Sequence, residues 1–147
     1  MVSYKKINAF DIEEEGVVLV EANLQGVINY PGFEKSYPKA YDLYMKTCAF
    51  NYRGRAGTFL LVEEKGRKVA IIFTSYSRKE KADKVIEAFK RGLANLLHAI
   101  PSDVFIYLPV LGRRSYMFSQ FSATIKSVDA LTKDAPRQWV ICTKGER

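Results

Sequence analysis

Val69-Ala70-Ile71-Ile72-Phe73, a long amphipathic stretch over residues 82–100, and Val104-Phe105-Ile106-Tyr107-Leu108 together decide the fold class of this chain. The two outer runs are continuously apolar, as is typical of strands buried on both faces of a sheet. In the middle stretch, apolar residues recur at intervals of three and four, which predicts one face of a long α-helix. These residues are Ala82, Val85, Ile86, Phe89, Leu93, Leu96, Leu97 and Ile100. Strand, helix and strand in this order predict an α/β protein.

Two residues within and after this helix carry further information. Gly92 costs about 1 kcal/mol relative to alanine in a helix interior, so we expect the helix to approach another backbone closely there. Pro101 is expected to stop the helix. His98 lies just before this end, where a histidine is more often found near the terminal carbonyls than in a catalytic site.

The other strands are predicted from similar apolar runs. We expect strands at Ser3–Phe10, Val17–Val20, Thr58–Val62 and Trp139–Cys142, with Lys65-Gly66 forming a hairpin turn before Val69.

Two shorter helices complete the predicted pattern. One should begin near Ser36, as a cap, and Pro38, and run to about Cys48. The other is marked by Phe121, Ile125, Val128 and Leu131. The whole order predicts a mixed sheet with helices on both faces.

Length and composition limit the possible classes of protein. The 147 residues predict a single domain over residues 1–147, and 48% hydrophobic with 27% charged residues are ordinary globular values. No apolar run approaches the roughly 18 residues of a membrane span. Residues 1–10 lack the apolar core of a secretory signal, so we expect a cytoplasmic protein without a membrane partner. The net charge of +7 favours anionic partners such as phosphate, nucleotide or nucleic acid.

The residues that usually build metal sites are scarce. Cys48 and Cys142 are the only cysteines and His98 is the only histidine. We therefore expect two buried, reduced thiols, no metal site and no cofactor. Glu13-Glu14-Glu15 is expected to be surface charge, because consecutive side chains on a turn diverge.

Two long connections are candidate binding loops. Residues 22–33 and residues 108–118 each follow a buried strand and lead into a predicted helix. Ligands of open α/β sheets bind beyond the carboxyl ends of strands, where glycines let backbone N–H groups approach a phosphate. Arg113-Arg114 adds guanidinium groups that suit phosphate oxygens. The alternative is that both loops are turns whose glycines only supply unusual dihedral angles.

The order of several short motifs resembles the macro domain family, and within it the branch of ADP-ribosyl-glutamate hydrolases and toxin-reversing antitoxins. Phe10-Asp11-Ile12 looks like the family's Gly-Asp-Ile, and Val17–Asn23 looks like its strand ending in Ala-Ala-Asn. Gln25-Gly26-Val27-Ile28, followed by Tyr37-Pro38 and Cys48, is similar to a stretch of that branch. Leu108-Pro109-Val110-Leu111-Gly112 resembles its phosphate loop. The resemblance implies a three-layer α/β/α fold with a central mixed sheet that binds ADP-ribose or a relative.

The resemblance also implies roles for individual residues. Asp11 would accept a hydrogen bond from the adenine amino group, and the Ile12 backbone would contact the ring. Asn23 would face the distal ribose and is the one tentative catalytic residue, holding a water. Backbone N–H groups for the pyrophosphate and distal ribose would come from Gly26, Val27, Ile28 and Gly32. The residues closing over the phosphates would be Gly112, Arg113, Arg114, Ser115 and Tyr116.

Simpler structural roles compete with three of these assignments. Asp11 could cap a turn, Asn23 could terminate a strand, and Tyr116 could anchor a loop.

The sequence departs from the branch at a position that matters for catalysis. Where the branch has Gly-Lys-Gly, with a lysine able to carry covalent chemistry, this chain has Asn29-Tyr30-Pro31-Gly32. Lys35 is close in sequence, but we expect it on the first exposed turn of a helix. Nucleophilic catalysis therefore lacks its lysine.

Three functions follow as hypotheses. The first is a binder of ADP-ribose or a related ADP-ribosyl or phosphorylated nucleotide, with weak or absent hydrolase activity. The second is an active hydrolase that removes ADP-ribose from a protein or nucleic acid, or phosphate from an ADP-ribose phosphate. The third is a basic RNA- or DNA-binding module, suggested by Phe50 beside Asn51-Tyr52-Arg53-Gly54-Arg55.

Overall fold

The protein is seen here in a computed structural model that describes residues 2–12, 14–26, 28, 30, 32–49, 56–75, 81–109 and 137–142. The strands are β1 (Val2–Lys5), β2 (Val17–Asn23), β3 (Phe59–Glu64), β4 (Arg67–Ser75), β5 (Ile106–Pro109) and β6 (Trp139–Cys142). The helices are the short 3₁₀ helix η1 (Ala9–Asp11), α1 (Phe33–Ser36), α2 (Pro38–Ala49) and α3 (Ala82–Ala99). The helix predicted around Phe121 to Leu131 lies outside the described residues.

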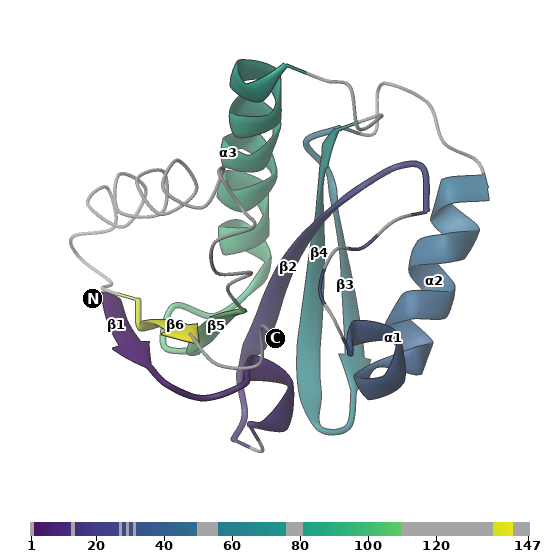
Figure 1. The fold of residues 1–147 in the computed structure, drawn as a ribbon. Coiled ribbons are helices and arrows are strands. Elements are labelled where there is room, and N and C mark those ends of the chain that lie inside the picture. Colours follow the sequence, from purple (N-terminus) through teal and green to yellow (C-terminus); the bar gives the residue numbers. More distant parts are fainter. Residues whose placement is uncertain are drawn as a thin grey trace.

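The six strands form one mixed sheet in the order β1-β6-β5-β2-β4-β3 (Figure 1). Neighbouring strands are parallel except β3, which runs antiparallel to β4 at one edge. The β3–β4 hairpin turns at Lys65 and Gly66, whose φ angles are +57° and +76°. The hairpin predicted at these two residues is therefore confirmed.

Apolar side chains cover both faces of the sheet. On one face, Val17 and Leu19 of β2 pack with Phe89, Leu93 and Leu96 of α3. On the other face, Val18 and Val20 pack with residues of α1 and α2 that include Phe33 and Tyr44. Figure 1 shows α3 and the α1–α2 pair on opposite sides of β2 and β4. The predicted arrangement of helix, sheet and helix in three layers is thus confirmed.

The close approach predicted at Gly92 is also confirmed. A Cβ atom at this position would lie 3.3 Å from the backbone oxygen of Gly57 and 2.6 Å from Cγ2 of Ile72. Glycine therefore lets α3 rest directly on the segment that leads into β3. His98 lies in the last turn of α3, as expected.

The strands β2, β3 and β4 extend beyond the predicted apolar runs, and three other predictions are wrong for local reasons. β1 ends at Lys5 rather than Phe10, because the Asn8 side chain accepts a hydrogen bond from the Phe10 N–H and caps η1. β5 begins at Ile106, since Val104 is still in the turn after α3, with its N–H bonded to Pro101 O at 3.4 Å. Ser36 does not cap α2: it is the last residue of the separate helix α1.

Candidate functional site

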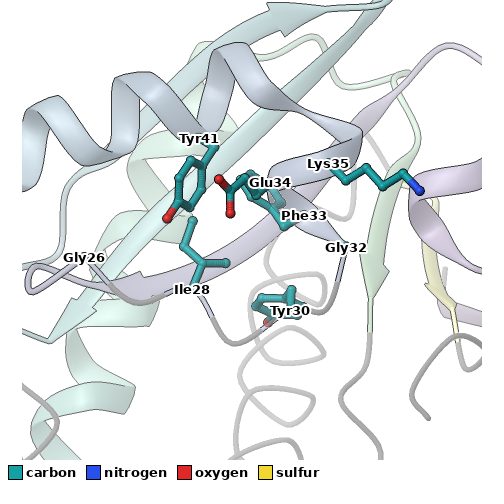
Figure 2. Close-up of a pocket in the computed structure, with 8 residues that line it drawn as sticks. All are labelled: Gly26, Ile28, Tyr30, Gly32, Phe33, Glu34, Lys35 and Tyr41. Carbon is teal, nitrogen blue, oxygen red and sulfur yellow. The ribbon is translucent and has the colours of Figure 1, made fainter.

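A cavity of about 620 Å³ opens beside the connection that leads from β2 to α1. β2 and its neighbour β5 are parallel, so their carboxyl ends face the same edge of the sheet. This is the edge at which ligands of α/β proteins usually bind. Figure 2 shows the lining side chains gathered around the connection and the first turns of α1 and α2. The cavity is lined by Gly26, Ile28, Tyr30, Gly32, Phe33, Glu34, Lys35 and Tyr41.

Two glycines shape this connection. Gly26 and Gly32 have φ angles of +86° and +85°, which side-chain-bearing residues rarely adopt. Gly32 directly precedes α1, and a Cβ atom there would meet nothing within 4 Å. Its backbone therefore borders open space in the cavity wall. Predicted binding residues Gly26, Ile28 and Gly32 are brought together here, whereas Val27 lies outside the described residues.

Asn23 ends β2, and its polar atoms have structural partners. It is 8% exposed, and its Oδ1 accepts a hydrogen bond of 2.8 Å from the Gln25 N–H. Its backbone oxygen accepts a 2.6 Å hydrogen bond from the Tyr44 hydroxyl. Asn23 thus fixes the turn at the start of the connection, which is the strand-terminating role named above as the alternative to ligand contact.

Tyr30 belongs to the segment that follows the cavity-lining Ile28, and its phenol is desolvated. Burial raises the pKa of Tyr30 well above its usual range; the negative charge of Glu21 adds to this, and a hydrogen bond to the Glu21 backbone opposes it. The ring lines the cavity (Figure 2). Tyr30 therefore contributes an aromatic ring to the cavity wall.

Glu21 is an unusual residue in the central strand β2. Its Oε2 accepts a 3.0 Å hydrogen bond from the Thr74 hydroxyl of β4. Burial raises the pKa of Glu21 above 4.5, and the bond from Thr74 partly offsets this. The apolar pattern of residues 17–23 predicted a strand but gave no role to this charged side chain.

Asp11 lies on η1, near the α1 side of the cavity but not in its wall. The Asp11 side chain is exposed, and its N–H donates to Asn8 O at 3.0 Å. The preceding Phe10 ring packs edge-on against Phe33, with centroids 5.8 Å apart, and Phe33 lines the cavity. The Ile12 carbonyl oxygen accepts a hydrogen bond from Arg67. The turn that carries Asp11 and Ile12 therefore contacts a cavity-lining residue through Phe10.

The second predicted loop begins where β5 ends. Pro109, the last residue of β5, pairs with Cys142 of β6, and β5 is the neighbour of β2. The second loop therefore starts at the carboxyl edge of the sheet, as the first loop does. The residues predicted to close over the phosphates, Gly112, Arg113, Arg114, Ser115 and Tyr116, lie outside the described residues.

Charges of both signs lie on the α1 side of the cavity. Glu34 and Lys35 are both exposed, and Lys35 is on a helical turn, as predicted. In Figure 2 the Lys35 ammonium group extends away from the other lining side chains, whereas the Glu34 carboxylate lies near Tyr41. The described wall therefore offers backbone and aromatic surface rather than strong positive charge.

The sequence reasoning missed several lining residues. Glu34 and Tyr41 contribute to the wall but belonged to no predicted binding loop, and Phe33 was included only as the last residue of the loop over residues 22–33. Their common signal is position, since all follow Gly32 within the first turns of α1 and α2.

The remaining predictions about chemistry concern metals, thiols and the membrane. Within the described part of the chain, no three His, Cys, Asp or Glu side chains are grouped so that they could hold a metal ion. Both cysteines are free thiols; Cys142 is buried, whereas Cys48 is only partly buried. No helix in the described ranges is long and apolar enough to span a bilayer.

Comparison with solved structures identifies the fold. The macrodomain of DarG from Thermus aquaticus matches with a TM-score of 0.72 and 19% identity, over 97% of this chain and 99% of that one. The macrodomain of DarG from Mycobacterium tuberculosis matches with a TM-score of 0.66 and 14% identity, over 98% and 99%. A macrodomain protein from Streptomyces coelicolor matches with a TM-score of 0.67 and 20% identity, over 97% and 99%.

These matches extend over almost the entire chain, so the protein has the macrodomain fold. No protein-family model and no curated protein sequence matches this chain. The macrodomain fold that the motif resemblance implied is therefore confirmed.

Proposed function

We propose that this chain, which has the macrodomain fold, binds ADP-ribose or a related ADP-ribosyl or phosphorylated nucleotide in the cavity between β2 and α1. The observation that carries the proposal is the position of this cavity. It lies at the carboxyl edge of parallel strands and is lined by Gly26, Ile28 and Gly32, which the motif resemblance had assigned to phosphate and ribose contacts.

Size and surface support the proposal. A volume of about 620 Å³ lies within the range of about 300–1,000 Å³ that is typical of small-molecule sites. The rings of Tyr30, Phe33 and Tyr41 offer apolar surface, and the glycine backbone allows close approach of phosphate oxygens. A net charge of +7 favours anionic ligands over the whole molecule.

Weak or absent hydrolase activity is part of the proposal. Tyr30 lines the cavity in the segment where the branch has its lysine, and Asn23 Oδ1 is already bonded to the Gln25 N–H. An acceptor held in a turn is less able to orient an attacking water. The test is incubation with ADP-ribosylated protein and nucleic acid: turnover that falls on Asn23→Ala would favour the hydrolase hypothesis instead.

The main experiment is calorimetry with a matched pair of variants. ADP-ribose should bind the wild-type protein, and Gly32→Asp should weaken binding tenfold or more, because it places a carboxylate at the cavity wall. Gly66→Asp is the control, since Gly66 also has positive φ and open space at Cβ but lies in the β3–β4 turn. Both variants carry the same added charge and similar backbone strain.

The outcomes distinguish binding at this cavity from binding elsewhere on the protein. Equal weakening by both variants would indicate a general effect of charge and would contradict the proposed location. Absence of binding to ADP-ribose, ADP and ADP-ribose phosphate at about millimolar concentration, which corresponds to about −4 kcal/mol, would reject the proposed function.

The nucleic-acid hypothesis depends on residues 51–55, which lie outside the described residues. It stays a prediction that a gel shift repeated at rising salt can test, since phosphate contacts make such affinity fall steeply with salt.

A further inference from the structure

Arg67 is a nearly buried arginine at the first residue of β4. It is 4% exposed, and the two N–H groups of its Nη1 are shared among three acceptors: Ala9 O at 3.0 Å, Ile12 O at 2.7 Å and the Tyr37 hydroxyl oxygen at 2.9 Å. The first two acceptors flank Asp11 in the chain. One guanidinium nitrogen therefore holds both ends of the turn that carries Asp11.

Burying the Arg67 guanidinium group costs free energy that a simple turn contact would not require. Its Nε and Nη2 are buried and have no hydrogen-bond partner within the described part of the chain. Its charge lies 5.3 Å from the centroid of the Tyr107 ring, which compensates only part of the desolvation. Burying a charge with part of its hydrogen-bonding capacity unused costs free energy, so overall stability is a weak explanation for Arg67.

The contacts of Arg67 connect the Asp11 turn with one wall of the candidate site. Its partner Tyr37 packs against Phe10, with centroids 5.7 Å apart, and against Phe33 at 5.8 Å. Phe10 precedes Asp11, whereas Phe33 lines the cavity. The guanidinium and the three rings thus fix η1 relative to α1.

We propose that Arg67 is a positioning residue of the nucleotide site, which sets the Asp11 turn at a fixed place relative to the cavity wall formed by α1. The proposal rests on the proposed function, and it goes beyond it by assigning a base-selecting role to a residue that touches no ligand. The motif resemblance assigns the amino group of adenine to Asp11 on this turn and the phosphates to the backbone of Gly26 and Gly32 in the cavity wall.

The first test compares two buried arginines. Arg137 is 5% exposed and donates to Pro101 O, Leu97 O and Ile100 O, all around the end of α3 rather than in η1, so it is a matched control. We expect Arg67→Met to weaken ADP-ribose binding about tenfold and to leave binding of ribose 5-phosphate, which lacks adenine, unchanged. Arg137→Met should leave the ratio of the two affinities unchanged. Equal ratios for both variants would overturn the proposal.

The second test asks whether Arg67 acts through Asp11. Asp11→Ala alone should weaken ADP-ribose binding, and adding Arg67→Met to it should weaken binding no further, because neighbours acting on one contact are not additive. Fully additive effects would show that Arg67 acts in another way. Tyr37→Phe removes one acceptor with little change of shape, so it gives a smaller effect of the same kind if Arg67→Met fails to fold.

Hydrogen exchange separates this proposal from the proposed function. In ligand-free protein, Arg67→Met or Tyr37→Phe should speed exchange of the Phe10 and Asp11 amides, which are bonded to Asn8, more than Arg137→Met does. If wild-type protein binds ADP-ribose but exchange and selectivity do not change, only the role of Arg67 is rejected. If wild-type protein does not bind ADP-ribose, the proposed function fails and the role of Arg67 in it fails too.

Discussion

Replacing Gly92 with alanine should destabilise the protein, although alanine is the better helix former. In an isolated helix the change would stabilise by about 1 kcal/mol. Here the new Cβ would lie 2.6 Å from Ile72 Cγ2, about 1 Å closer than two carbon atoms normally approach. Ile72 is fully buried, so it has little room to move. Overpacking costs about 1–3 kcal/mol, and a clash this short against an immobile side chain belongs to the upper part of that range, about 2–3 kcal/mol, which exceeds the gain in helix propensity.

The expected net loss of about 1–2 kcal/mol corresponds to a decrease in Tm of roughly 2–8 °C for a protein of this size. Thermal or chemical unfolding of Gly92→Ala measures it, with the exposed Asn95→Ala of the same helix as control, for which we expect no loss. In an Ile72→Ala background the penalty at position 92 should shrink, because the clashing Cγ2 is gone. A Gly92→Ala protein as stable as wild type would refute the close contact between α3 and the sheet.

Three other changes test the interior of the fold. Burial raises the pKa of Glu21, so ionisation opposes folding and stability should fall as pH rises above about 4.5 through the folded-state pKa. Glu21→Gln should therefore be more stable than wild type at neutral pH but not at low pH, and an equal difference in denaturation midpoints at both would contradict this. Burial raises the pKa of the Cys142 thiol to about 11, so a thiol reagent should modify Cys48 first in native protein; equal rates would show that Cys142 is accessible. Tyr44→Phe removes the 2.6 Å bond to Asn23 O and should cost about 1 kcal/mol in urea unfolding, whereas an unchanged midpoint would mean that the bond contributes nothing.

The sequence was a good guide wherever burial decided the structure. The β2 and β4 runs and the apolar face of α3 were predicted because all three elements lie against the core, where pattern and fold agree. The close approach of α3 to another backbone at Gly92 was also predicted, because a glycine that weakens a helix interior requires a packing explanation.

Local polar contacts were harder to predict. β1 ends before Asn8, whose side chain accepts a hydrogen bond from the Phe10 N–H and so competes with strand pairing. A single polar contact of this kind does not change the pattern of apolar residues from which the strand was predicted. Ser36 was assigned to the wrong helix, because Gly32 starts a short helix of its own. A single turn has too few residues to show helical periodicity.

The candidate site was predicted in part. Short motifs pointed to Gly26, Ile28 and Gly32, which the structure places around one cavity. Arg67 could not be found in this way. Its importance arises from contacts with Ala9 and Ile12, more than fifty residues away in sequence, and no local pattern records them.

The position of β6 has a consequence for how the chain acquires its shape during synthesis. β6 lies between β1 and β5, and it is the strand with which β1 pairs, so Val2 lies opposite Trp139. During synthesis, residues 139–142 must therefore leave the ribosome before β1 can pair with β6. Until then the backbone of β1 has no neighbouring strand with which to pair.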